Sequence, residues 1–184
     1  EIDSSKKAVS NGNYIYNGAF QEGDGRMGDW ELANASGKAK VSVSGISDGR
    51  RLVVDTTACD LAETAKLIQK DVPVQPASKY VFSFDYEVLQ GNASDFKVKI
   101  FGNEYSVKPE AEKAARAAST KETFSVKLDT AAEVTDKDVE FIVGSNLKLA
   151  IDNVWLVEDA LIKNGKFEAG ISGFEVYSYT NSDV

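Results

Sequence analysis

Apolar and polar residues alternate along most of this chain with a period of two. The stretch Val41-Ser42-Val43-Ser44 shows the alternation in its simplest form. Residues 80–86 place four aromatic side chains on one face, Tyr80, Phe82, Phe84 and Tyr86, and leave Val81, Ser83 and Asp85 on the other. Because successive side chains of a strand point to opposite faces, this period predicts β-strands, with the aromatic row in the core. Tyr86, at the end of the row, is the member that can reach solvent.

Further strands are predicted at residues 51–56, 66–74, 96–101, 123–128, 139–143 and 149–157. They are short, rich in β-branched and aromatic residues and separated by polar turns, of which Gly102-Asn103 is typical of a hairpin. This pattern predicts an all-β sandwich of two antiparallel sheets. Residues 109–118 differ, because a proline followed by strong helix formers predicts a short helix inserted between two strands.

An internal repeat divides the chain. The segment Tyr16–Gly23 recurs at residues 162–170, where Asn164-Gly165-Lys166-Phe167 matches Asn17-Gly18-Ala19-Phe20. Repeats at the spacing of a domain indicate copies of one unit. We therefore expect a linker at residues 1–12, one complete module at 13–159, and at 160–184 a linker with the first strand of a second, truncated repeat.

The amino-acid composition limits the kinds of active site and partner that this chain can have. The chain has no histidine and one cysteine, Cys59, which excludes Ser-His-Asp and Cys-His catalysis, histidine-bound zinc and a disulfide framework. Its net charge of −8 disfavours nucleic acid and anionic membrane surfaces as partners, since nothing would neutralise phosphates. No apolar run is long enough to cross a bilayer. A pair of carboxylates is the remaining route to an active site.

Three motifs in order resemble carbohydrate-binding modules of the family 4, 9, 16 and 22 group, over roughly residues 13–158. They are Asn17–Phe20 near the start, residues 69–84 with Gln69-Lys70-Asp71-Val72-Pro73-Val74 at their head, and Ile151-Asp152-Asn153-Val154-Trp155-Leu156 at the end. The opening is similar to modules that accompany family 16 β-1,3-glucanases. The resemblance implies a jelly-roll sandwich, a secreted or cell-surface location, and a glycan site on a concave sheet face or in the end loops.

The resemblance also implies a structural calcium ion where the first and last strands meet. Calcium prefers carboxylate and carbonyl oxygens. Carried over by position, the ligands would be the Gly18 carbonyl, Gln21 and Asp152. This sequence departs from the family at Gln21, where a glutamate is usual and where the repeat keeps Glu168. The amide removes one charge, so calcium affinity is expected to be lower.

Candidate sugar contacts are aromatic and planar polar side chains on solvent-facing positions, because sugar rings stack on aromatic faces and hydroxyls need polar partners. The alternation places Phe101 with Lys97 and Lys99, and turns Trp155 outward. Trp155 and Trp30, a further candidate, each have a second interpretation. Trp155 can pack on a neighbouring module, and Trp30 can close the end of the sandwich core. The set of candidate ligand-binding residues is Trp30, Gln69, Asp85, Tyr86, Phe101 and Trp155, with solvated surface as the alternative for the polar ones.

The sequence thus predicts a non-catalytic module that binds polysaccharide, with β-1,3- or mixed-linked β-glucan preferred, and that targets an attached glycoside hydrolase to its substrate. Its partners would be the glycan and neighbouring modules of the same chain. The alternative is a spacer or a cell-surface module that contacts protein. An enzyme acting through two carboxylates is disfavoured because no glycosidase motif is evident.

Overall fold

The computed structural model describes residues 12–34, 37–46, 49–60, 64–91, 93–107 and 121–159. In these ranges the chain forms one short 3-10 turn, η3 (Asp24–Arg26), and ten strands. The strands are β1 (Glu31–Asn34), β2 (Lys40–Ser44), β3 (Arg51–Asp55), β4 (Thr64–Gln69), β5 (Lys79–Gly91), β6 (Lys97–Ile100), β7 (Asn103–Ser106), β8 (Lys121–Asp129), β9 (Val139–Gly144) and β10 (Leu147–Glu158). No helix within these ranges is long and apolar enough to cross a membrane.

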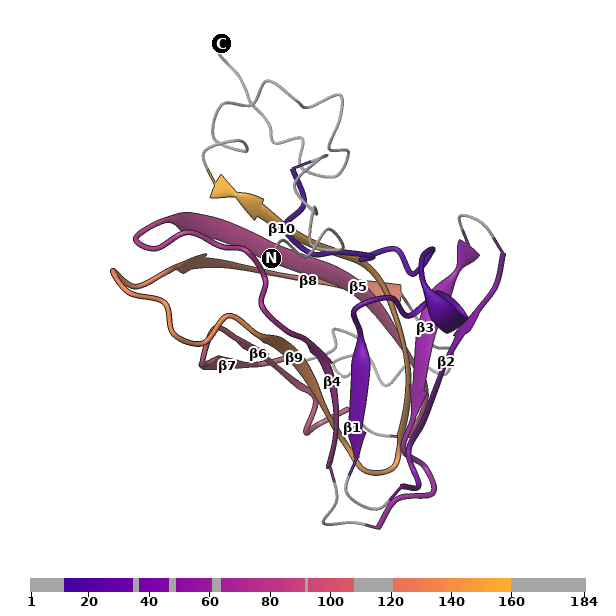
Figure 1. Ribbon diagram of the computed structural model, residues 1–184. Helices are drawn as coiled ribbons and strands as arrows, with labels where there is room; N and C mark the ends of the chain where they lie inside the picture. The colour runs from indigo at the N-terminus through magenta and orange to yellow at the C-terminus, as the bar shows by residue number, and fades with distance from the viewer. Residues whose placement is uncertain are drawn as a thin grey trace.

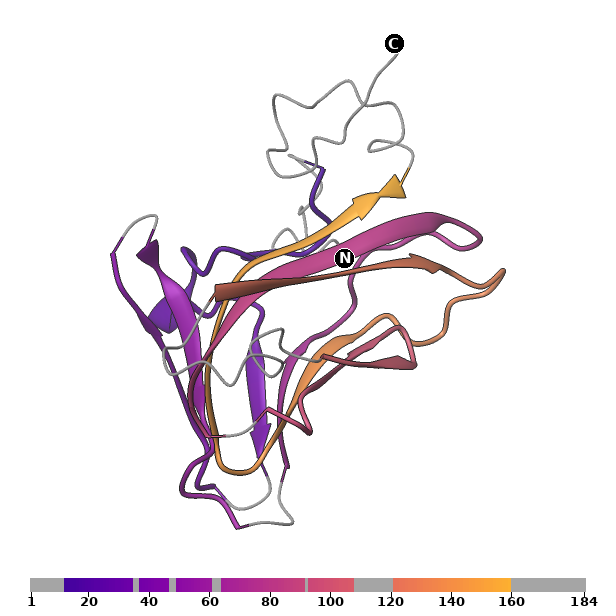
Figure 2. The same cartoon turned by 180° about the vertical axis from the view of Figure 1, so that it is seen from behind.

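The strands form two antiparallel sheets of five strands each. The β4 sheet has the order β1-β4-β9-β6-β7, and the β5 sheet has the order β2-β3-β10-β5-β8. Figures 1 and 2 show the two sheets as separate layers, with the long strands β5 and β10 bending along their length. Both strands lie inside their sheet, with β10 between β3 and β5. Residues that β10 turns away from the core therefore lie at the centre of the outer face of the β5 sheet.

The core between the sheets comes from the alternation seen in the sequence. Tyr80, Phe82, Phe84 and Tyr86 of β5 are 0–4 % exposed, as predicted. Phe84 packs edge-on against Phe141 of β9, with ring centroids 4.9 Å apart, which joins the two sheets. Edge-to-face contacts of this kind add about 1 kcal/mol beyond burial of area.

The segment before β1 completes the β5 sheet beyond the end of β3. The Tyr14 amide donates to the Leu156 carbonyl at 2.8 Å, and the Val154 amide donates to the Gly18 carbonyl at 3.1 Å. The Asn13 side chain adds to this seam, with its Nδ2 on the Val154 carbonyl and its Oδ1 accepting from the Leu156 amide. The start of the module is thus fastened along its last strand.

The loop between this segment and β1 is organised by one asparagine. Asn17 Nδ2 donates to the carbonyls of Glu22, Arg26 and Gly28 at 3.0–3.1 Å, and its Oδ1 accepts from the amides of Gln21 and Glu22. The chain bends tightly here, with η3 inside the bend. The loop places Trp30 in the core at the end of the sandwich.

The predicted β-sandwich of two antiparallel sheets is confirmed. Strands β1 and β7 were not predicted, and β4 ends at Gln69 rather than at Val74. The hairpin after β6 turns one residue early, at Phe101-Gly102, and Phe101 has a φ of 50°. The predicted helix at 109–118, the second repeat at 160–184 and nearly all of the linker at 1–12 lie outside the described residues.

Candidate functional site

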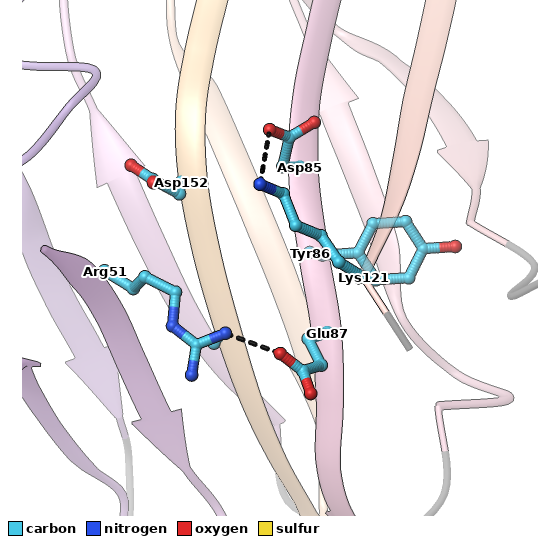
Figure 3. A pocket seen from close by; sticks show the side chains of 7 residues that line it. Arg51, Asp85, Tyr86, Glu87, Lys121 and Asp152 are labelled. Carbon is cyan, nitrogen blue, oxygen red and sulfur yellow. Dashed lines mark hydrogen bonds and ion pairs between the residues drawn. The ribbon is translucent and has the colours of Figure 1, made fainter. Parts of the chain in front are cut away.

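A shallow hollow opens on the outer face of the β5 sheet. It is lined by Arg51, Asp85, Tyr86, Glu87, Lys121, Ala150 and Asp152, which come from four adjacent strands (Figure 3). The strand register explains why these residues meet. Asp152 pairs with Asp85, Asp85 with Thr123, Ala150 with Glu87, and Glu87 with Lys121. These positions alternate with core residues, so their side chains lie on the outer face of the sheet.

The floor of the hollow is Ala150, which is 1 % exposed. Arg51 of β3 reaches across β10 at this point, and its Nη1 lies 2.6 Å from Oε1 of Glu87 on β5. Figure 3 shows this ion pair over the β10 ribbon. The pair spans two strand spacings, about 10 Å. A small residue between the partners leaves room for it.

Asp85 is held by three groups on neighbouring strands. Thr123 Oγ1 donates to its Oδ1 at 2.7 Å, Asn153 Nδ2 donates to its Oδ2 at 2.9 Å, and Lys121 Nζ lies 3.8 Å from Oδ2. Most of the hydrogen-bonding capacity of this carboxylate is therefore already used. Asp85, a predicted ligand-binding residue, does line the hollow, and its contacts are those of a group that orders its neighbours.

Asp152 has a different environment. Its Oδ1 accepts from the Asn153 amide at 2.8 Å. Burial raises the pKa of this half-buried carboxyl above its ordinary value, and the neighbouring Asp85 raises it further, against the Asn153 amide, Lys121 and Arg51. With Glu87 and Arg51 it offers planar acceptors and donors on an open face. Such groups suit ligand hydroxyls, which both donate and accept.

Trp155 lies on the same face as the hollow. It pairs with Ser83, whose side chain shares the outer face of β5 with Asp85, and it is partly exposed. The prediction that Trp155 faces outward is confirmed. An aromatic ring next to planar polar groups is the combination that recognises a sugar ring.

Three of the predicted sugar contacts are corrected, because the structure buries their side chains. Trp30 is 5 % exposed, packs against Phe20 and Phe141, and donates from Nε1 to the Asn17 carbonyl. Tyr86 is 4 % exposed, and Figure 3 shows its ring pointing away from the hollow.

Gln69 is fully buried, with its side-chain amide paired to the backbone of Tyr16 through both Oε1 and Nε2. It lies in the β4 sheet and Asp85 in the β5 sheet, so the two are not neighbours. Phe101 lies in the turn after β6 and packs against the core rather than beside the lysines. Its left-handed backbone breaks the strand alternation on which its prediction depended.

Arg51, Lys121 and Ala150 were not among the site residues predicted from the sequence. The alternation at Arg51-Leu52-Val53-Val54-Asp55 was the available signal for Arg51, since it places Arg51 opposite the core positions. Nothing in the sequence brings Lys121 near Asp85, because that contact depends on the register of β8 with β5.

In the structure, the three residues proposed for calcium have protein groups as neighbours. The Gly18 carbonyl accepts from the Val154 amide, and Gln21 Oε1 accepts from the guanidinium of Arg50. Asp152 lines the hollow, beside Arg51 and Asp85. Among the described residues there is no group of three or more acidic, cysteine or histidine side chains that could hold a metal. The Arg50 guanidinium brings a positive charge to Gln21, one of the three proposed ligands.

Comparison with solved structures shows which folds the chain shares. A family 16 carbohydrate-binding module matches with a TM-score of 0.52 at 16 % identity, covering 79 % of this chain and 100 % of that one. A xylan-binding domain of family 22 matches with a TM-score of 0.51 at 16 % identity, covering 81 % and 96 %. These similarities support the jelly-roll β-sandwich.

The enzymatically active domain of tailspike protein 4 from bacteriophage CBA120 matches with a TM-score of 0.60 at 14 % identity. The match covers 80 % of this chain but 21 % of the tailspike chain. No curated protein sequence matches significantly.

The sequence comparison goes further than the fold. Residues 12–148 match the family described as carbohydrate binding domain, CBM_4_9, which is most of the β-sandwich. This family match indicates a non-catalytic carbohydrate-binding module. The chain therefore belongs to the carbohydrate binding domain family, and its β-sandwich is a module of that kind.

Proposed function

We propose that this module binds β-glucan, β-1,3- or mixed-linked, along the outer face of the β5 sheet. The observation that supports the proposal is the position of Trp155 on the same face as the hollow. One sugar ring would stack on the indole, and the hydroxyls of the sugar units that follow it in the polymer would meet Asp152, Glu87 and Arg51. One stacked ring and a few hydrogen bonds correspond to dissociation constants of about 1 μM to 1 mM.

The open form of the face favours binding over bond cleavage. Asp85 and Asp152 are a cross-strand pair, and opposed residues on a sheet have Cβ atoms about 5 Å apart. Glycoside hydrolysis needs one such carboxyl to act as an acid inside an apolar pocket. Here Asp85 is held by Thr123, Asn153 and Lys121 on an open surface. Of the pair, Asp152 is the carboxyl that can accept from ligand hydroxyls, while Asp85 is already held by its neighbours.

In the proposed role the module keeps an attached glycoside hydrolase near its polymer. Tethering raises the effective concentration of an enzyme at its substrate without any new catalytic contact. A soluble or surface-exposed polysaccharide lies outside the cell, so we place the protein there, secreted or attached to a cell surface. Neighbouring modules of the same chain would be its other partners.

A protein-contact or spacer role is the second candidate. It is favoured by one observation, that Trp155 is partly rather than fully exposed, as expected of a residue at the rim of an interface. In that case the indole would pack against a neighbouring domain. Glycan titration separates the two roles.

The test is a titration of the full chain with laminarin, mixed-linkage β-glucan, xylan and cello-oligosaccharides, followed by calorimetry and tryptophan fluorescence. We expect saturable binding to one of the first two and a loss of about tenfold or more in Trp155→Ala. Ile46→Ala is the matched control, because Ile46 is an apolar residue 79 % exposed beside β2. Absence of binding to every glycan, with the fold intact, would support the protein-contact role.

A further inference from the structure

We propose that Asn153 is the positioning residue of this binding face, acting through a bulge in β10 and through the carboxylate of Asp85. The part of the inference that concerns glycan affinity rests on the proposed function. The part that concerns the face on which Trp155 lies does not depend on any ligand.

The first observation is the register of β10. Between Asp152 and Trp155 the strand advances three residues, while its partner β5 advances two, from Asp85 to Ser83. This is the count that defines a β-bulge. In a regular strand, residues three apart point to opposite faces. The bulge is therefore the reason that Trp155 and Asp152 share the outer face, while Ile151 and Val154 both enter the core.

The second observation is the backbone of the bulge. Asn153 is exposed and has a φ of 50°, in the left-handed region. Among residues with a side chain, asparagine is one of the few that adopt this conformation readily. A β-branched residue at the same position would oppose it. The identity of residue 153 thus favours the bulge over a regular strand.

The third observation is the direction of the Asn153 side chain. Its Nδ2 donates to Asp85 Oδ2 at 2.9 Å, across the strand pair. The other oxygen of Asp85 is held by Thr123 from β8, and Lys121 lies 3.8 Å from Oδ2. One residue therefore turns the tryptophan outward and also fixes the carboxylate that borders Asp152. The tryptophan and the polar groups are placed relative to each other by Asn153.

The two effects are separated by two substitutions. Asn153→Gly keeps the left-handed backbone and removes the amide, so Trp155 should stay as accessible to iodide quenching as in the wild type. Trp30 is 5 % exposed, so quenchable emission reports Trp155. Affinity for mixed-linkage β-glucan should fall about tenfold, because a hydrogen bond to a charged group is lost. In an Asp85→Ala background the same substitution should cause no further loss.

Asn153→Val tests the bulge, because it keeps the number of residues and a β-branched residue resists a positive φ. If the strand becomes regular with residue 153 retained, Trp155 should turn toward the core side and lose most of its iodide quenching, with glycan binding abolished. Deletion of Asn153 is the control, because it leaves Asp152 and Trp155 two residues apart in a regular strand, so the tryptophan should stay on the outer face and keep its quenching. The quenching and affinity of Asn153→Val should both fall below those of Asn153→Gly.

Two results would overturn the inference. One is a folded Asn153→Val variant whose tryptophan is quenched as in the wild type. The other is an affinity loss in Asn153→Gly that persists undiminished in the Asp85→Ala background. A wild type that binds no glycan would overturn the proposed function instead, and the quenching comparison, which needs no ligand, would still decide the role of the bulge.

Discussion

Arg51 and Glu87 form an ion pair across an intervening strand, with Nη1 and Oε1 2.6 Å apart above Ala150. The Arg51 and Glu87 side chains are 35 % and 19 % exposed, so the pair is partly shielded from solvent. The ion pair forms one side of the hollow. The pair can form because the side chain beneath it, that of Ala150, is small.

Ala150→Leu should remove the hollow without removing the fold. A leucine at the floor fills the space and separates Arg51 from Glu87, so affinity for β-glucan should fall at least about tenfold. Stability should change by about 1 kcal/mol, because an ion pair of this exposure contributes little. Calorimetric titration and urea unfolding measure the two effects. Ala131→Leu, at an exposed loop position, is the control, and an Ala150→Leu protein with wild-type affinity would contradict this assignment of the site.

Asn17→Ala should destabilise the module through the loop that carries Trp30. The asparagine side chain makes hydrogen bonds to five backbone groups, and its removal leaves three carbonyls and two amides without that partner. Since these groups are partly solvent-accessible, we expect a loss of about 2 kcal/mol. Urea unfolding measures it. Asn103→Ala, at an exposed position in β7, should lie within about 0.5 kcal/mol of the wild type.

Gly18→Ala tests the close approach of the first segment to β10. A Cβ at residue 18 would lie 2.1 Å from the Val154 carbonyl oxygen, so the seam must open. We expect a loss of about 2 kcal/mol or more. Gly49→Ala is matched to it, because the new methyl meets nothing within 4 Å. Equal stability of the two variants would show that the seam is looser than described.

Asp152 and Asp55 should give opposite pH dependences. Burial raises the pKa of Asp152 in the folded state, so its contribution to stability is most favourable at low pH and is lost as pH rises through the raised pKa. The Thr57 hydroxyl, donating at 2.6 Å, lowers the pKa of Asp55. Asp55 therefore stabilises the fold above its unfolded pKa, and this contribution is lost as pH falls through the lowered value.

The corresponding variants are Asp152→Asn and Asp55→Asn, compared by urea unfolding between about pH 2 and pH 7. Relative to the wild type, Asp152→Asn should gain stability as pH rises above the ordinary aspartate range. Asp55→Asn should lose stability over the same rise. Each variant is the control for the other, and two curves with the same sign would show that one environment is misassigned.

Calcium should leave the melting temperature unchanged. Gln21 Oε1 is occupied by Arg50 and the Gly18 carbonyl by the Val154 amide, so the donors named by the family resemblance are already bonded. Thermal unfolding with excess calcium and with chelator measures this directly. Arg50→Ala should lower the melting temperature equally in both. A saturable rise with calcium would restore the cation that the resemblance implies.

Much of the fold could be predicted because burial on β5 follows strict alternation. Tyr80, Phe82, Phe84 and Tyr86 all face inward, and no long-range knowledge was needed to place them. Trp30 is different, because its burial depends on the loop that Asn17 ties together. Gln69 is different again, since its amide is satisfied by the backbone of Tyr16, 53 residues away. Polar residues whose partners are distant in sequence cannot be told from surface residues by pattern.

Only part of the candidate site could be predicted from the sequence. Alternation counted back from Leu156 gave the outward direction of Trp155 correctly. The same count carried on to Asp152 would have put that residue in the core, because the bulge at Asn153 shifts the phase of the strand. Arg51 reaches Glu87, and Lys121 reaches Asp85, only because of the register in which β3, β10, β5 and β8 pair. Cross-strand geometry of this kind is set by the whole sheet.

The seam between Asn13 and β10 has a consequence for how the protein is made. Asn13 bonds to Val154 and Leu156, which follow it by 141 and 143 residues. A ribosome adds about 5–20 residues per second, so roughly ten seconds separate the emergence of the two partners. During that interval the opening segment has no strand to join, and Ile15 and Phe20, both destined for the core, stay in solvent or with a chaperone. The module can close only when its synthesis is nearly complete.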